Sequence, residues 1–194
     1  MMWNPSNIRG ALRVLPILLL AVSVLAAGCD DGFGSGRAPL IGNSVTLFSA
    51  AREDLFRMPS AIDFFRFQVR PIEHQLATGD GWDVALTEVG SEFGLAAPGV
   101  FPGLESMNAG IAVFSGKTLE EVERAPAESS AYADTEPVPL RLGDVYVIRS
   151  RRLQGCTVYA KIQAVELDPT VGSVVFEYIV NPNCADRNLV RRDD

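Results

Sequence analysis

Two β-rich runs near the C-terminus most constrain the fold of this chain. Residues 157–167 read TVYAKIQAVEL and residues 173–180 read SVVFEYIV, and the intervening DPTVG favours a turn. This pattern predicts an antiparallel hairpin. If the turn is centred on Thr170, Ile162 faces Tyr178 and Cys156 faces Cys184, because the members of each pair lie equally far from residue 170.

The same register places apolar side chains on one face of the hairpin, and a shift by one residue would turn that face to solvent. The face comprises Val158, Ala160, Ile162, Ala164, Val174, Phe176, Tyr178 and Val180. Opposed Cα atoms of an antiparallel pair lie about 4.5 to 5.5 Å apart, within the range of a disulfide. We therefore predict a Cys156–Cys184 disulfide, since two cysteines alone lack the further ligands of a zinc site.

Three other segments carry strand patterns. Residues 144–150, DVYVIRS, predict a strand that joins the hairpin in a meander. Residues 63–70 and 82–88 both alternate between apolar and polar positions. The expected buried faces are Phe65, Phe67 and Val69 in the first, and Trp82, Val84 and Leu86 in the second, with Asp83 on the polar side.

Helical signals are short. Residues 50–58 favour a short helix, and Thr118 with Glu121 matches a capping box that predicts about two turns ending before Pro126. The Gly-rich, apolar stretch from Phe93 to Met107 either lines a ligand cleft or closes one end of the core. We therefore predict a mainly β fold: antiparallel sheet(s) with a C-terminal β-meander/hairpin and one or two short helices.

The N-terminus resembles a bacterial lipoprotein signal peptide. Residues 14–28 are uncharged and, except for Ser23, apolar; they follow Arg9 and Arg13 and are too few to span a membrane comfortably. The run ends LAAGC, similar to a lipobox with cleavage between Gly28 and Cys29. This similarity implies acylation of Cys29, including palmitate. Ordinary cleavage near Ala27, or an uncleaved anchor, is the alternative.

We expect four parts in the chain: a lipoprotein signal peptide over residues 1–28, a flexible tether over 29–40, one β-rich globular domain over 41–190 and a charged tail over 191–194. The predicted location is the bacterial cell envelope, lipid-anchored through Cys29 and exported, with the choice between inner and outer membrane open. The net charge of −7 has the wrong sign for a partner held by its phosphate backbone, so we expect no nucleic acid.

Motifs for catalysis are missing from the sequence. His74 is the one histidine, and it reads as a solvated loop residue rather than a member of a catalytic triad. Zinc, redox, phosphate-loop and calcium signatures do not occur, so we expect no cofactor, no metal site and no catalytic residue. Paired carboxylates are open in principle, although the acidic clusters at 30–31, 120–123 and 193–194 read as solvated faces or tails.

The segments WDVAL, TLEEVERAP, DVYVIRS, YAKIQAVELD and VVFEYIVNPN occur in an order that resembles HmuY-like envelope lipoproteins. This resemblance implies a β-rich fold with one main helix and, in some members, haem capture by paired axial side chains. A histidine pair cannot be carried over, because His74 has no second histidine; Met58 and Met107 are more plausibly core or loop residues.

From these features we expect a membrane-anchored exported lipoprotein that acts as a non-catalytic binding or interaction module with an unidentified ligand. The alternative is a carboxylate-dependent hydrolase acting on an envelope polymer. Two carboxylates in a cleft would favour the enzyme, and an apolar pocket would favour binding.

Overall fold

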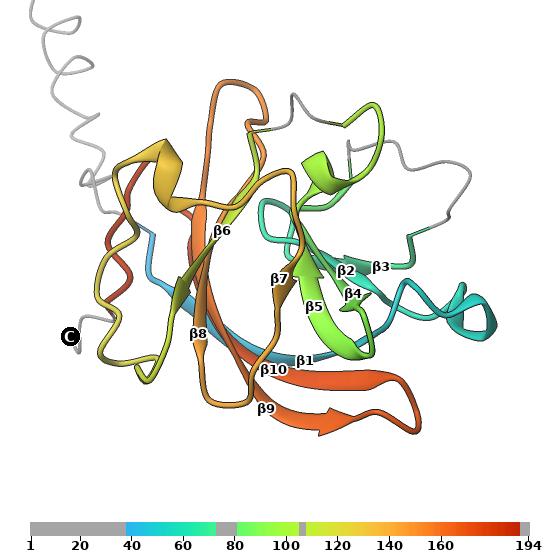
Figure 1. The fold of residues 1–194 in the computed structure, drawn as a ribbon. Coiled ribbons are helices and arrows are strands. Elements are labelled where there is room, and N and C mark those ends of the chain that lie inside the picture. The colour runs from blue at the N-terminus through green and yellow to red at the C-terminus, as the bar shows by residue number, and fades with distance from the viewer. Residues whose placement is uncertain (1–37, 73–80, 105–107, 191–194) are drawn as a thin grey trace, which may run out of the picture. The chain divides into compact units, whose positions relative to one another are not determined.

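The computed structural model describes residues 38–72, 81–104 and 108–190, and these residues form two antiparallel sheets (Figure 1). The first sheet has the order β1 (Ile41–Phe48), β10 (Ser173–Asn181), β9 (Tyr159–Asp168), β8 (Val145–Arg149), β6 (Gly110–Phe114). The second has the order β3 (Gln68–Arg70), β2 (Ala61–Asp63), β4 (Val84–Val89), β5 (Glu92–Ala96), β7 (Val138–Pro139). The predicted β class is confirmed.

Helical structure in the described part of the chain is limited to 3-10 turns of three residues each. Those that lie wholly within the described residues are η1 (Glu53–Leu55), η3 (Pro98–Val100) and η5 (Ser129–Ala131). Within that part we find no helix with the length and apolar character of a transmembrane segment.

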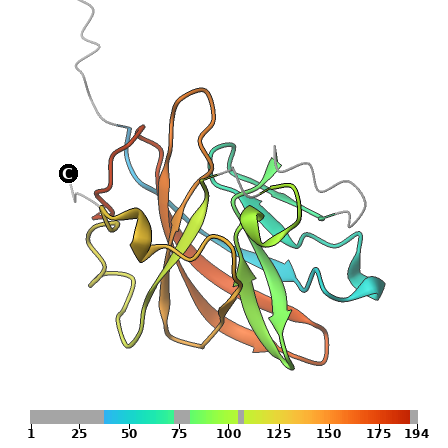
Figure 2. The same cartoon turned by 45° about the horizontal axis from the view of Figure 1, so that its top comes forward.

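The predicted C-terminal hairpin is confirmed. Ile162 lies opposite Tyr178 and Ala164 opposite Phe176, and the register changes by one residue only at a bulge near the turn, between Val175 and Phe176. β8 pairs with β9, so the expected meander is present, and its three strands run side by side in Figures 1 and 2. The Cα atoms of Cys156 and Cys184 lie 5.3 Å apart and the disulfide forms, as predicted.

The two sheets pack face to face over one core, because alternate residues of each strand turn apolar side chains inward. Tyr146 and Phe176 from the first sheet meet Val84, Leu86 and Leu95 from the second, and all are buried. Two smaller apolar clusters cover the outer faces. One joins Leu119, Val122, Ala125 and Leu189 to β6 and β8, and the other surrounds Trp82.

The expected strand over residues 63–70 is wrong. The segment is a hairpin in which β2 and β3 are joined by a turn, and Phe67 in that turn has φ 55° and is exposed. The Asp63 carboxylate accepts the backbone N–H groups of Phe65 and Arg66, both at 3.0 Å, which stabilises the turn. Phe64 therefore fills the core, Phe65 packs against the core while only partly buried, and Phe67 is exposed.

The helix expected after Thr118 is also wrong, although its capping box forms. The Thr118 N–H donates to Glu121 at 2.9 Å and the Glu121 N–H donates to Thr118 Oγ1 at 3.4 Å. The chain then continues as turns, and residues 123–125 pair with residues 187–189 through the Ala125 and Leu189 N–H groups. This pairing and the burial of Leu119 and Val122 hold the segment in an irregular form.

The signal peptide, Gly28, Cys29, most of the tether, His74, Met107 and the charged tail lie outside the described residues. At the predicted end of the tether, Ala38 exchanges two hydrogen bonds of 2.8 Å with the Asn183 side chain. β1 begins three residues later, at Ile41.

Candidate functional site

A large cleft lies where three connections meet: the β4–β5 turn, the loop before β8 and the β9–β10 turn. Its volume is about 820 Å³. Its lining combines apolar and charged side chains: Phe93, Leu140, Leu142, Leu167 and Pro169 with Glu88, Glu92 and Arg141, completed by Gly90 and Ser91. Among the described residues of the Phe93–Met107 stretch only Phe93 lines this cleft, whereas Phe101 and Leu104 pack around Trp82, so most of the stretch closes the core.

A second hollow of about 360 Å³, here called the arginine pocket, lies at the other end of the β9–β10 hairpin. It is lined by Asn108, Ala127, Ser129, Tyr132, Arg149, Arg152, Gly155, Thr157, Tyr159 and Ala185. Ten residues separate Thr157 here from Leu167 in the large cleft, so the two hollows lie roughly 30 Å apart along β9.

Arg149 at the end of β8 is held rigidly in the arginine pocket. Its Nε donates to the Asn108 carbonyl at 2.8 Å and its Nη1 donates to Ser129 Oγ at 3.1 Å. The guanidinium carbon lies 4.6 Å from the centre of the Tyr132 ring. These contacts fix the plane of the guanidinium, which is the condition for recognising oxygen atoms by paired hydrogen bonds.

Tyr132 contributes a neutral hydroxyl and an aromatic face. Burial, reinforced by the neighbouring Tyr159, raises its pKa against the opposing effects of Arg149 and Arg187, and its hydroxyl donates to the Pro126 carbonyl at 3.0 Å. A Cβ added to Gly110 would lie 2.8 Å from Tyr132 Cβ, so glycine is required for this close approach. The ring is thus a fixed wall rather than a titrating group.

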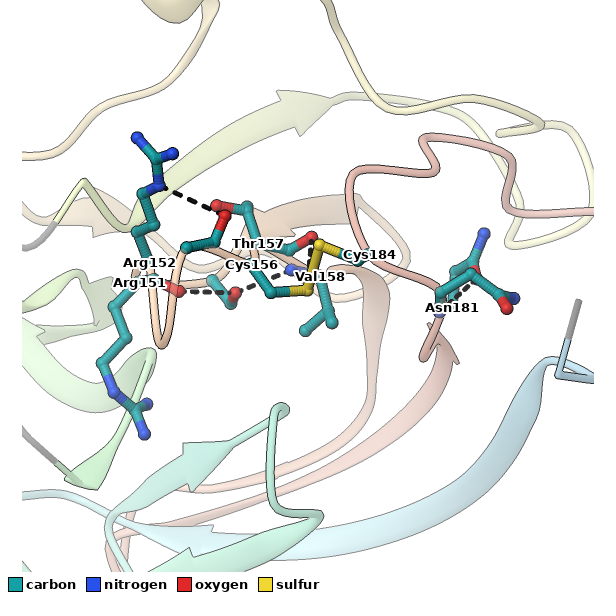
Figure 3. The surroundings of a disulfide bond; sticks show 10 residues. Arg151, Arg152, Cys156, Thr157, Val158, Asn181 and Cys184 are labelled. Atoms are coloured by element: carbon teal, nitrogen blue, oxygen red, sulfur yellow. Dashed lines mark hydrogen bonds between the residues drawn. A yellow bond between two sulfur atoms is a disulfide. The ribbon is translucent and has the colours of Figure 1, made fainter. Parts of the chain in front are cut away.

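The disulfide and a strained backbone shape the same pocket. Gly155 and Thr157 flank Cys156, which is bonded to Cys184 (Figure 3). Ala185 follows Cys184, and its N–H donates to the Thr157 carbonyl at 2.8 Å. Ala185 and Asn108 both have a φ of 56°, and Gln154, next to Gly155, has 51°. Left-handed conformations at non-glycine residues cost of order 1–3 kcal/mol and gather at functional sites.

A buried ion cluster joins the two sheets beneath these loops. Arg151 donates from Nη2 to Asp63 at 2.9 Å and from Nη1 to Asp83 at 2.8 Å, and all three side chains are at most 3% exposed. The Asp83 carboxylate also accepts the Phe64 and Arg151 N–H groups, at 2.7 and 2.9 Å. Asp83 is therefore not on a polar face, as its place in residues 82–88 predicts, but among the most buried residues.

The pKa values of the two carboxyl groups in this cluster are shifted in opposite directions. Burial raises the pKa of Asp83 to about 6, although the charge of Arg151 lowers it. Burial also acts on Asp63, but hydrogen bonds from Arg151 and Arg66 outweigh it and hold the pKa below its ordinary value. Because no substrate reaches side chains this deeply buried, the cluster holds the sheets together rather than reacting.

Sequence reasoning identified the cysteines but missed the arginines. Arg149, Arg151 and Arg152 follow one another around Ser150, and Figure 3 shows Arg151 and Arg152 pointing in opposite directions from the loop. The only signal was this cluster of basic residues in an acidic chain. Among the described residues, no group of three or more His, Cys, Asp or Glu side chains is placed to hold a metal. Glu120, Glu121 and Glu123 are exposed, as expected.

Comparisons of the chain with protein-family models, curated proteins and solved structures found no match. The similarity to HmuY-like lipoproteins therefore stays a prediction from the sequence.

Proposed function

We propose that this protein is a lipid-anchored binding module of the bacterial cell envelope that holds a small organic ligand in the large cleft without converting it. The cleft carries the ligand-binding part of the proposal. Its volume of about 820 Å³ falls within the usual range of small-molecule sites, roughly 300–1,000 Å³. Its apolar lining combines one strand residue from each sheet, Phe93 of β5 and Leu167 of β9, with Leu140, Leu142 and Pro169 from the connections.

The cleft also suggests the type of ligand. Phe93, Leu140 and Leu167 are partly or fully buried and offer an apolar wall, whereas Glu92 and Arg141 are exposed at the rim. Such a site suits a molecule with an apolar body and a polar end that stays near water.

Native mass spectrometry of the full-length protein, extracted in a mild detergent, tests ligand binding. We expect a retained small molecule that is absent from a Leu142→Arg variant, because Leu142 lines the cleft, is 58% exposed and makes little contribution to the core. Val113→Arg is the matched control: Val113 is 44% exposed and lies on β6, away from the cleft. A ligand retained equally by both variants would contradict the assignment to this cleft.

The anchor part of the proposal rests on the LAAGC segment and is tested separately. We expect the mature protein to begin at an acylated Cys29 and to partition with membranes, because two or more acyl chains give stable attachment. Intact-mass analysis of the N-terminus checks this, with a Cys29→Ser variant as control. An unmodified N-terminus at another residue, or a Cys29→Ser protein that remains acylated, would overturn it.

One observation favours the hydrolase as a second candidate: two carboxylates, Glu88 and Glu92, line the same cleft. Glu88 accepts a hydrogen bond from Ser49 at 3.1 Å. Glu88→Gln and Glu92→Gln distinguish the two functions. A hydrolase acting through this pair would lose turnover of envelope glycans in either variant with its fold intact, whereas a binding module shows no turnover to lose.

A further inference from the structure

We propose that the arginine pocket is a second binding site, independent of the large cleft, and that it takes a phosphate monoester group. The lining contains two arginines and no carboxylate, in a chain whose net charge is −7. The nearest acidic residues in sequence, Glu128 and Asp186, adjoin lining residues without lining the pocket themselves. An acidic protein that gathers positive charge in one hollow attracts anions there.

The donors in the pocket suit a tetrahedral dianion. Arg149 has five N–H donors, of which its bonds to Asn108 and Ser129 engage two. Arg152 is exposed, and its Nε makes a long bond of 3.3 Å to the Gly155 carbonyl (Figure 3). The hydroxyls of Ser129, Thr157 and Tyr159 complete the set. A carboxylate carries one charge on two oxygens, whereas a phosphate monoester carries up to two charges on three terminal oxygens and so matches two guanidinium groups together with several hydroxyls.

The walls of the pocket are arranged before any ligand arrives. The Tyr132 ring holds the plane of Arg149, and the disulfide ties the Cys156 loop to Ala185. Three of the four described non-glycine residues with positive φ line the pocket or adjoin its lining. Binding therefore requires little ordering of side chains or loops, which favours affinity. The volume of about 360 Å³ exceeds the size of a phosphate group, so the ligand carries an organic substituent as well.

Calorimetric titration of the full-length protein in non-ionic detergent with phenyl phosphate tests the proposal. We expect saturable binding that Arg152→Gln weakens about tenfold, because one charge-assisted contact is lost. Arg152 is exposed, so the variant should unfold at the same urea concentration as the wild type. Arg57→Gln is the matched control: it removes the same charge from an exposed residue whose contact is the ring of neighbouring Phe56. No saturable binding, or equal loss in both variants, would overturn the site.

Three further readouts distinguish the chemistry. Benzoate should bind at least about tenfold more weakly than phenyl phosphate, and equal binding would refute selection of a phosphate. Binding should strengthen from pH 5 to pH 7, since the second phosphate ionisation has a pKa of about 6 and the described lining contains no histidine and no carboxylate. Soluble dihexanoyl phosphatidic acid identifies the source: tighter binding than phenyl phosphate indicates a lipid headgroup, and weaker binding indicates a soluble phosphomonoester.

Discussion

At the residue scale, Asp63, Asp83 and Arg151 form a cluster of three charges buried between the sheets. Each carboxylate accepts two backbone N–H groups, but Asp63 also accepts hydrogen bonds from two guanidinium groups, Arg151 and Arg66, whereas Asp83 accepts from Arg151 alone. The better-compensated carboxyl stays ionised and the other is the more easily protonated. Removing one member of such a cluster costs about 3–5 kcal/mol, because an uncompensated buried charge is left behind.

The raised pKa of Asp83 predicts a pH dependence of stability. The unfolded chain ionises this carboxyl near the ordinary pKa of 3.8, and the folded chain near 6. Between these values the folded chain holds one more proton, so the contribution of Asp83 to the free energy of unfolding falls as pH rises from about 4 to about 6. Asp63, with a lowered pKa, stays ionised through this window and adds no slope.

Asp83→Asn should remove this dependence. Urea unfolding between pH 4.5 and pH 7 is expected to show the wild-type advantage over Asp83→Asn shrinking with rising pH, by at most about 3 kcal/mol, since each pKa unit corresponds to about 1.4 kcal/mol. Asp134→Asn, at an exposed position, serves as control and should follow the wild type. An advantage that grows towards pH 7 would contradict the predicted direction.

Among the elements, the β9–β10 hairpin organises both hollows, since its turn borders the large cleft and its open end borders the arginine pocket. The disulfide closes that open end. Its loop separates the cysteines by 28 residues, which corresponds to roughly 3–4 kcal/mol in the chain-entropy account of disulfides.

The double variant Cys156→Ser, Cys184→Ser should therefore lose roughly 3–4 kcal/mol in the free energy of unfolding. Urea denaturation measures this loss, and a reducing agent should lower the midpoint of the wild type but not that of the double variant. Two free thiols in the exported protein, found by nonreducing peptide mapping, would count against the bond.

The irregular segment formed by residues 117–125 is held in place by one buried lysine. Lys161 on β9 is 2% exposed, points away from the core, and donates from Nζ to the carbonyls of Leu119 and Val122, the latter at 2.9 Å. These bonds fasten residues 117–125 to the outer face of the first sheet and replace the helix that the capping box predicts.

Lys161→Met should loosen that segment, because the carbonyls lose charge-assisted donors worth about 1.5–3 kcal/mol each. Hydrogen exchange is expected to accelerate at the Ala125 and Leu189 amides, which join this segment to residues 187–189. Lys117→Met is the control: Lys117 is exposed and 3.7 Å from Glu121, a pair worth less than about 1 kcal/mol. Unchanged exchange in Lys161→Met would show that apolar packing alone holds the segment.

At the scale of the whole molecule, two sheets share one core, and the two hollows described above lie where loops meet. Sandwiches of this kind place their variable loops at the ends of the strands, where binding sites can differ without disturbing the core. The two hollows of this protein lie at such loops. The buried ion cluster lies in the scaffold between the sheets.

The composition of the whole chain argues against haem binding through two histidines. A six-coordinate site with two imidazoles needs two histidines, and this chain supplies only His74. A haem titration followed by absorbance should give no saturable Soret shift that depends on His74. Met58 is 38% exposed and offers at most a single weak ligand. A shift that vanishes in His74→Ala, with a second histidine supplied by a dimer, would contradict this expectation.

What the sequence determined by itself was local: the β class, the hairpin register and the cysteine pair. Alternation with period two reports which side of a strand is buried, and a turn signal sets which residues face each other. The expectation for residues 63–70 failed by the same logic, because alternation cannot reveal that Asp63 closes a turn there.

Only the tertiary structure decided the arginine pocket and the ion cluster. In that cluster Arg151 meets Asp83 and Asp63, which lie 68 and 88 residues away in the sequence. Such contacts depend on how two sheets stack, and no spacing within either strand encodes that.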